Sequence, residues 1–91
     1  MTEIKRKHIV FYGSVQGVGF RYRVRLAAGL VGCTGWVRNE WDGSVSMEIQ
    51  GTESAIDQVI LAIERGHYVQ IDNMDVKELE LIEDEHGFRT Y

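Results

Sequence analysis

The sequence predicts an α+β fold, a sandwich in which one mainly antiparallel sheet carries two helices on one face. Two segments have apolar residues at helical spacing. They alternate with short runs of β-branched and aromatic residues, in the order β-α-β-β-α-β. Glycine follows each helical segment, and an Asp-Gly pair separates the two middle strands. This is the split β-α-β order, and without proline, repeat or linker we expect a single domain over residues 1–91.

The first half of the chain opens with a predicted strand at residues 7–12, where β-branched and aromatic side chains dominate. A helix is expected at residues 20–31, because apolar positions recur on one face and a glycine follows as a C-terminal cap. A second strand is expected at residues 34–39. The Asp42-Gly43 pair that comes next is the strongest local signal for a hairpin.

The third predicted strand covers residues 44–50, in which apolar and polar side chains alternate. One of its faces should therefore be buried and the other wet. Thr52 or Ser54 can cap the helix that follows, whose isoleucine and valine residues have the spacing of a buried stripe. Gly66 is expected to end that helix.

The last part of the chain is predicted to contain a loop at residues 67–73, a strand at residues 74–82 and a short strand at residues 87–91. Val76 is out of phase with the later apolar residues of its strand, which predicts a bulge or an early bend there. Residues 83–85 are all acidic, and we expect them to form a solvated turn before the last strand.

Charge is unevenly distributed along the chain, whose formal net charge is −4. Residues 1–38 contain seven Lys or Arg and one acidic residue, whereas residues 39–91 contain three Lys or Arg and thirteen acidic residues. The acidic total argues against nucleic-acid binding, and the basic first part suits a small anionic ligand unless the two parts interleave in space. Residues 5–7 are expected to be a solvated N-terminal arm.

Hydropathy and cysteine usage predict the compartment. The N-terminus lacks the apolar stretch of a signal peptide, and no run approaches the length of a membrane span. Cys33 is the single cysteine, so it cannot form an internal disulfide, and we expect it to be a small buried side chain. We therefore expect a cytoplasmic protein that does not associate with membranes.

The stretch that points to chemistry is the loop between the first strand and the first helix, which contains three glycines and ends at Arg21. Glycines let backbone N–H groups approach a ligand, and a helix start adds unpaired donors and a partial positive charge. Arg21 adds a planar fork that matches phosphate oxygens. The loop lacks the Gly-Lys-Ser/Thr of a Walker loop, and Tyr22 replaces the third glycine of a dinucleotide fingerprint. Two interpretations stay open, a phosphate cradle and a tight turn.

Residues 15–21, with the sequence Val-Gln-Gly-Val-Gly-Phe-Arg, resemble the signature of the acylphosphatase family. A second motif of that family, Gly-Trp-Val-Arg-Asn, occupies residues 35–39, and the similarity extends to Phe88. The resemblance implies a ferredoxin-like fold and a small free-standing enzyme. Such an enzyme hydrolyses the carboxyl-phosphate bond of small acyl phosphates to a carboxylate and inorganic phosphate. No metal or cofactor is implied, and we expect a monomer.

The resemblance also implies roles for individual residues. The matching arginine of the family holds the phosphoryl group, so this role is expected of Arg21. The asparagine that ends the second motif positions the attacking water, which implies this role for Asn39, a turn residue on sequence alone. Neither motif holds a histidine or carboxylate, so the substrate's own phosphate oxygen is expected to take the proton. The residues expected to bind phosphate, mainly through backbone N–H groups, are Gln16, Gly17, Val18, Gly19, Phe20 and Arg21.

Two other classes of function stay open. A non-catalytic module of the same fold could bind phosphate or carbamoyl phosphate without turnover. An RNA-binding module on a similar frame would need exposed aromatic residues on the strand at 44–50, where Ser46, Glu48 and Gln50 stand instead.

The remaining polar and aromatic residues have simpler interpretations. Arg23 and Arg25 are expected to be solvated helix residues. Trp36 is expected in the core, and Trp41 is expected to be exposed near the mouth of the site. The histidines are too far apart in the chain to suggest a metal site: His8, His67 and His86.

Overall fold

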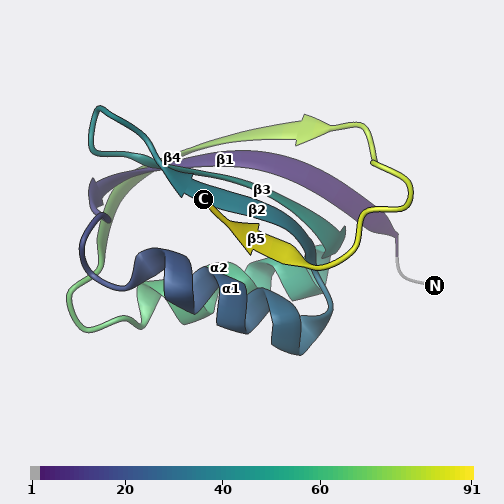
Figure 1. The fold of residues 1–91 in the computed structure, drawn as a ribbon, viewed down its shortest axis with the longest axis horizontal. Coiled ribbons are helices and arrows are strands. Elements are labelled where there is room, and N and C mark those ends of the chain that lie inside the picture. Colours follow the sequence, from purple (N-terminus) through teal and green to yellow (C-terminus); the bar gives the residue numbers. More distant parts are fainter. Residues whose placement is uncertain (1–2) are drawn as a thin grey trace.

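The computed structural model describes residues 3–91, which form two helices and one five-stranded sheet (Figure 1). In chain order the elements are β1 (Ile4–Ser14), α1 (Phe20–Val31), β2 (Thr34–Asn39), β3 (Val45–Thr52), α2 (Glu53–Glu64), β4 (Gln70–Leu79) and β5 (Phe88–Thr90). The sheet order is β4-β1-β3-β2-β5. Only β2 and β5 are parallel neighbours among these strands. Both helices cover the same face of the sheet (Figure 1), so the predicted ferredoxin-like α+β fold is confirmed.

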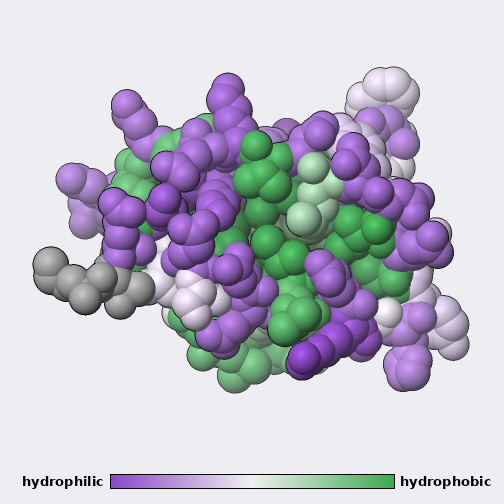
Figure 2. Space-filling model, turned by 180° about the vertical axis from the view of Figure 1, so that it is seen from behind, coloured by the Kyte–Doolittle hydropathy of each residue, from purple (hydrophilic) through white to green (hydrophobic). Residues whose placement is uncertain are grey.

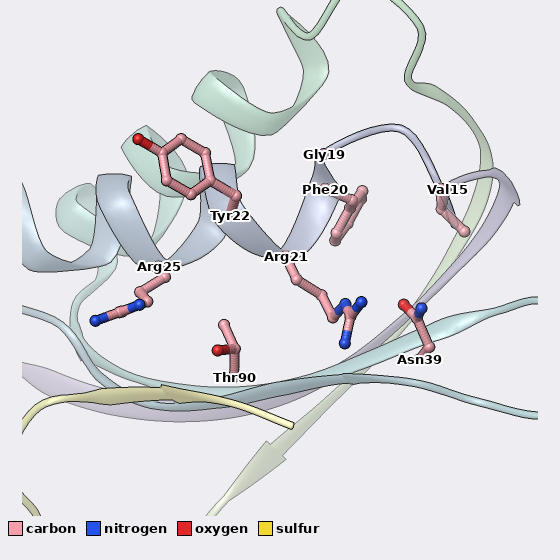
Figure 3. A pocket seen from close by; sticks show the side chains of 9 residues that line it. Val15, Gly19, Phe20, Arg21, Tyr22, Arg25, Asn39 and Thr90 are labelled. Atoms are coloured by element: carbon pink, nitrogen blue, oxygen red, sulfur yellow. The ribbon is translucent and has the colours of Figure 1, made fainter.

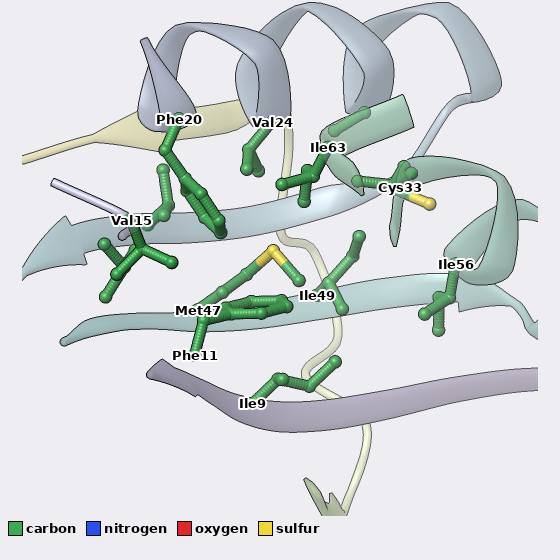
Figure 4. Close-up of a cluster of buried hydrophobic side chains, with 14 of the residues drawn as sticks. Ile9, Phe11, Val15, Phe20, Val24, Cys33, Met47, Ile49, Ile56 and Ile63 are labelled. Carbon is green, nitrogen blue, oxygen red and sulfur yellow. The ribbon is translucent and has the colours of Figure 1, made fainter. Parts of the chain in front are cut away.

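The core lies between this face of the sheet and the two helices (Figure 4). Phe11 of β1 and Phe20 of α1 meet edge to face, with their ring centroids 5.0 Å apart. Cys33 is buried as expected, and burial raises the pKa of its thiol to about 11. The other fully buried side chains that surround these residues are Ile9, Val24, Val37, Val45, Met47, Ile49, Ile56, Val59 and Ile63.

Helix α1 and strand β2 have the predicted bounds. α1 ends at Gly32, whose N–H donates to the carbonyl of Ala28. The hydroxyl of Thr52 accepts a hydrogen bond of 3.0 Å from the N–H of Ala55, so the first of the two candidate residues caps α2. Neither helix within residues 3–91 is long and apolar enough to cross a membrane.

Strands β1 and β4 are longer or earlier than predicted. β1 runs over Ile4–Ser14, because it pairs with β3 along one side and with β4 along the other. β4 begins at Gln70 and ends at Leu79. The predicted loop at 67–73 and the predicted end of the strand at 82 were therefore wrong. Pairing with the far end of β1 satisfies backbone groups at residues 70–73 that a loop would have left to solvent.

The predicted irregularity at Val76 is also wrong in position. The register of β1 against β4 shifts between Tyr12 and Gly13, which leaves Asp72 without an opposite residue. Val76 and Leu79 lie on opposite faces of β4, because they are three positions apart in a regular strand and side chains alternate between the two faces. Their phase difference therefore reflects two faces that each carry an apolar residue.

β4 lies at an edge of the sheet, which explains why both of its faces can carry a partly exposed apolar side chain. Figure 2 shows the molecule from behind, with apolar surface exposed near its centre between hydrophilic side chains. Val76 is 53% exposed, and Leu61 of α2 is 47% exposed. The helix layer therefore leaves the side chains of the edge strand partly uncovered.

The predicted solvated arm at residues 5–7 is wrong for Arg6, which is only 1% exposed on the face of the sheet opposite the helices. Its guanidinium donates to Glu48 of β3 at 3.0 Å and to both carboxylate oxygens of Glu85, at 2.7 and 3.2 Å. Gln50 accepts a further hydrogen bond from Arg6 at 3.2 Å and also bonds the backbone of Ile82. Glu85 is therefore not part of a solvated turn, and residues 80–87 are held against the sheet.

Two further predictions about this face are wrong. Trp36 lies outside the core, because in β2 it alternates with Val37, which faces the helices. Its ring instead packs near His8 and Tyr91, with centroid distances of 6.1 and 6.5 Å. Ser46, expected on the wet face of β3, is 3% exposed, so this face is only partly open to water.

The ion pair between Arg6 and Glu85 predicts a pH-dependent contribution to stability. Burial alone would raise the pKa of the Glu85 carboxyl, but hydrogen bonds from Arg6 and Thr34 hold the pKa below its ordinary value. The stabilisation is therefore present at neutral pH and is lost as the pH falls below the ordinary carboxyl pKa of about 4.3. At pH 7 Glu85→Gln should lower the free energy of unfolding by about 1.5–3 kcal/mol in urea titrations.

The difference between Glu85→Gln and the parent chain should shrink when the titrations are repeated at pH 3, because below the ordinary carboxyl pKa the unfolded chain binds a proton at Glu85 that the ion pair in the folded chain resists. The matched control is Glu83→Gln in the same acidic run, which should change stability by less than about 0.5 kcal/mol. Equal losses in the two variants at pH 7 would contradict the assignment of the ion pair.

Candidate active site

The loop between β1 and α1 is fixed at both ends by buried side chains. Val15 and Phe20 are 1% and 2% exposed, so the residues between them must arch over the surface of the core. Gly17 and Gly19 have φ angles of 72° and 78°, a left-handed conformation that is costly for residues with a Cβ. Gly19 is also the N-cap of α1, and no side chain caps the helix there.

This conformation leaves backbone donors free. No hydrogen bond joins the N–H groups of residues 16–19 to another group within residues 3–91. The first turn of α1 contains no acidic residue, so nothing on the helix neutralises the partial positive charge at its start. Unpaired N–H groups at a helix N-terminus are a favourable environment for an anion.

Gln16 has a structural function that sequence reasoning did not predict. Its side-chain amide donates to the main-chain oxygens of Glu40 and Ser44, at 2.6 and 2.8 Å. These two oxygens belong to the turn between β2 and β3. The contact therefore attaches the glycine loop to that turn, and the Gln16 side chain is turned away from any ligand in the loop.

Arg21 and Asn39 approach each other from different elements, and in Figure 3 their polar ends point toward one another. Arg21 is the second residue of α1, and its Nη1 donates to the main-chain oxygen of Tyr91 at 2.6 Å. A guanidinium has five N–H donors, so this single contact orients Arg21 and leaves most donors for a ligand. Asn39 is the last residue of β2, half-buried, and its side chain forms no hydrogen bond within residues 3–91.

The turn after Asn39 is stabilised by two carboxylates. Glu40 accepts hydrogen bonds from Ser46 and from Arg38, which hold the pKa of its carboxyl below the ordinary value. Asp42 accepts from the hydroxyl and the N–H of Ser44, at 2.6 and 3.0 Å, and these bonds lower its pKa as well. The two carboxylates are thus occupied within the turn and keep the end of β2 in place.

Loop, helix start and β2 together line a cavity of about 330 Å³ (Figure 3). Among the residues predicted for the site, the structure brings Gly17, Gly19, Phe20, Arg21 and Asn39 to this cavity. Gln16 and Val18 are not among the lining residues, because their side chains are directed elsewhere. Gln16 bonds the turn, and Val18 packs partly against the core.

Three cavity residues were missed by sequence reasoning: Tyr22, Arg25 and Thr90. Arg25 had been expected to be simply solvated, but it lies one helical turn after Arg21 and therefore on the same side of α1. That spacing was the available signal. Thr90 comes from β5, whose place beside β2 no local pattern reveals. Trp41 is 98% exposed, as expected, but does not line the cavity.

The charged side chains that line the cavity are Arg21 and Arg25, and no carboxylate or imidazole is among the lining residues. Within residues 3–91 no three His, Cys, Asp or Glu side chains gather in a way that could hold a metal ion. The arrangement can therefore bind an anion by charge and N–H donors and can orient a small polar molecule through Asn39. A proton acceptor would have to come from the ligand.

Comparisons with known proteins agree with this geometry. The family model described as acylphosphatase matches residues 7–90. The acylphosphatase of Geobacillus kaustophilus is 42% identical over 87 residues, which are 94% of this chain and 93% of that protein.

Solved structures show the same similarity. The crystal structure of acylphosphatase from Bacillus subtilis superposes with a TM-score of 0.86 at 32% identity, covering 98% of this chain and 99% of that one. Full-length HypF in its phosphate- and nucleotide-bound form gives a TM-score of 0.82 at 27% identity. That match covers 100% of this chain but 12% of HypF.

Binding of inorganic phosphate provides a direct test of the cavity. Phosphate should raise the melting temperature of the parent chain above that in chloride of equal ionic strength, because a ligand of the folded state stabilises it. In Arg21→Ala the apparent phosphate affinity, taken from the dependence of melting temperature on phosphate concentration, should fall roughly 10- to 100-fold. A charge-assisted hydrogen bond contributes ~1.5–3 kcal/mol.

The matched control is Arg23→Ala on the same helix. The Arg23 side chain lies beside Gly66, beyond the end of α2, and does not line the cavity. Its loss removes the same charge but should leave phosphate affinity within about twofold, because Arg23 lies two positions after Arg21 on the helix, about 200° around its axis, and its side chain is directed toward Gly66 and away from the cavity. Comparable losses of affinity in the two variants would show that Arg21 does not contact the anion.

Proposed function

The chain belongs to the acylphosphatase family, and we propose that Arg21, the glycine loop and Asn39 are the parts that carry out its reaction. The enzyme hydrolyses the carboxyl-phosphate bond of small acyl phosphates and releases a carboxylate and inorganic phosphate. The observation that carries the assignment of residues is the cavity in which free N–H groups, Arg21 and the Asn39 amide converge.

The phosphoryl group occupies the glycine loop in this proposal. Its oxygens accept hydrogen bonds from the N–H groups of residues 16–20 and from the N–H and guanidinium of Arg21. The free donors in the loop and the contact that holds Arg21 at Tyr91 both support this placement. Donors that are already oriented need little rearrangement when charge shifts during phosphoryl transfer.

Asn39 orients the attacking water. Its amide oxygen can accept a hydrogen bond from water while its NH₂ group donates to a phosphate oxygen. The position at the end of a paired strand, followed by a turn that Glu40 and Asp42 stabilise, holds the amide rigidly. Placing the water opposite the leaving carboxylate lowers the barrier mainly by orientation.

The proton of the water passes to an oxygen of the substrate phosphate. The lack of a carboxylate or imidazole among the cavity residues supports this route. In a loose transition state the nucleophile needs little activation, so a strong protein base is not required. Metal-independent catalysis without a cofactor, a monomeric state and a cytoplasmic location complete the proposal.

The function is tested by incubating the purified chain with benzoyl phosphate and measuring the inorganic phosphate that is released. Turnover by the purified chain is the expected result. A chain that binds inorganic phosphate but does not turn over benzoyl or acetyl phosphate would instead be a phosphate-binding module. The observation that favours this second function is the similarity to a segment of HypF, a larger protein in which such a domain forms only a part.

Asn39→Ala should separate catalysis from binding. If Asn39 orients water, its interaction contributes more in the transition state than in the ground state, so kcat should fall roughly 10²- to 10³-fold. Phosphate affinity should change little, because the loop donors and Arg21 remain. Asn73→Ala in β4, outside the cavity, is the matched control and should keep the kcat of the parent chain.

A structural role for Asn39 makes a different prediction. Loss of a turn asparagine would cost about 1 kcal/mol of stability and leave kcat of the folded protein nearly unchanged. Measuring kcat, phosphate affinity and melting temperature on one preparation distinguishes the two roles. A near-normal kcat with a lowered melting temperature would assign Asn39 to the turn alone.

Exhaustive chelation should leave the rate unchanged, because the proposed chemistry uses only the donors of the chain and an oxygen of the substrate. The measurement is benzoyl phosphate hydrolysis before and after treatment with chelating resin. Loss of activity that one particular divalent metal restores would contradict the metal-independent mechanism.

A further inference from the structure

The cavity continues beyond the position proposed for the phosphoryl group. Tyr22 and Arg25 line the cavity on one side and an adjoining groove of about 390 Å³ on the other. The groove follows the outer surface of α1, where Leu26, Gly29 and Leu30 form the rest of its lining. A ligand whose phosphate lies in the loop can therefore extend along the helix without leaving the surface.

Arg25 stands where cavity and groove join. It lies one turn after Arg21, about 6 Å further along the axis of α1. In Figure 3 the Arg25 guanidinium extends away from Arg21, between α1 and β5, and Thr90 lies between the two arginine side chains in this view. The two guanidinium groups therefore point in different directions. A single phosphate bound in the glycine loop would contact the guanidinium of Arg21 but not that of Arg25.

The charge of Arg25 is not neutralised by the chain. Its side chain forms no hydrogen bond or ion pair within the described residues, in contrast to Arg6 and Arg38, which pair with carboxylates. Helix α1 contains no acidic residue. β5 contributes Thr90 to the cavity, whereas Arg89 alternates to the other face of the sheet, beside Trp36 and Glu85. An exposed cation that faces a cavity and lacks a carboxylate partner is available to an anionic group of a ligand.

Tyr22 contributes an aromatic wall to the adjoining groove, and its ring projects from α1 on the side away from the two guanidinium groups (Figure 3). Its side chain is 68% exposed, and that of Leu26 in the next turn is 53% exposed, so the groove is largely apolar apart from Arg25. A ligand suited to this surface has a phosphate at one end, an apolar spacer and a second anionic group at the other end.

We propose that Arg25 forms a second anion subsite, which selects acyl phosphates whose acyl group ends in a carboxylate beyond a short apolar spacer. This inference rests on the proposed function, because it takes the glycine loop as the position of the phosphoryl group. Arg25 is then a specificity-determining residue. It contacts the distal carboxylate and takes no part in the transfer of the phosphoryl group.

Two substrates that differ only in the distal charge test the subsite. The probe is 4-carboxybenzoyl phosphate, and benzoyl phosphate is the matched substrate without the second charge. The rigid ring prevents the distal carboxylate from attacking its own acyl group. The parent chain should show a higher kcat/KM for the charged probe, and the difference should lie in KM, because the added contact exists before the reaction and throughout it.

Arg25→Gln should lower this preference, the ratio of the two kcat/KM values, roughly tenfold, the effect of one exposed charge-assisted contact. Arg25→Lys should retain most of the preference because it keeps the charge. Arg23→Gln removes the same charge from the same helix outside the cavity and should leave the ratio unchanged. Melting temperatures confirm that all variants are folded.

The outcomes distinguish failure of the proposed function from failure of the proposed subsite. A parent chain that hydrolyses neither substrate overturns the proposed function. A parent chain that hydrolyses both substrates with equal kcat/KM overturns the subsite alone. Equal reductions for both substrates in Arg25→Gln also overturn it, because Arg25 would then act on the phosphate.

Discussion

The packing of Phe20 against Phe11 is the contact on which the geometry of the site depends. Phe20 is the first residue of α1 and is buried, so the start of the helix is held against the sheet at one fixed rotation. Since side chains of a helix are spaced by 100°, this rotation directs Arg21 and Arg25 toward β5 and the cavity. The loop before Phe20 is stretched between two buried side chains, and glycines with left-handed backbone angles close the distance.

The other half of the site is positioned from the opposite face of the sheet. Arg6, buried beneath residues 80–87, pairs with Glu85, and Gln50 bonds the backbone of Ile82. These contacts fix the segment that precedes β5. The pairing of β5 with β2 then places Tyr91 beside Arg21. A buried pair of this kind contributes little net stability compared with apolar packing, but removing one partner is costly. Its structural effect here is to give the last strand one defined position.

The resulting site consists almost entirely of donors. Free N–H groups, two guanidinium groups and an amide surround a cavity that no carboxylate side chain lines, while the carboxylates of Glu40 and Asp42 are occupied within the turn after Asn39. Such an arrangement favours an anion strongly and provides no proton acceptor of its own. It suits phosphoryl transfer, in which positioning and charge stabilisation outweigh acid–base chemistry. The chain thereby needs few residues for its reaction, and the rest of the cavity can serve recognition of the acyl group.

Local patterns in the sequence predicted the order of elements and the bounds of α1 and β2, and they narrowed the cap of α2 to two residues. Each depends on residues close together in the chain, such as helical periodicity or a glycine after a helix. The extent of β1 and β4 was not predictable in this way, because backbone pairing with a distant strand decides it. The resemblance to the acylphosphatase family, and not local pattern, singled out Asn39, which is a turn residue on sequence alone.

Only the tertiary structure decided the burial and the contact partners of four side chains: Arg6, Glu85, Gln16 and Trp36. Arg6 lies in a run of basic residues that looks solvated, and only the return of residues 80–87 over the sheet buries it. Arg25 likewise acquires a neighbouring cavity only when β5 arrives beside α1. A charged side chain has no intrinsic preference that reveals its partner, since its environment depends on groups brought together from distant parts of the chain. The sequence therefore predicted which segments form helices and strands, and the tertiary contacts decided which charges are buried, which are paired and which remain without a partner.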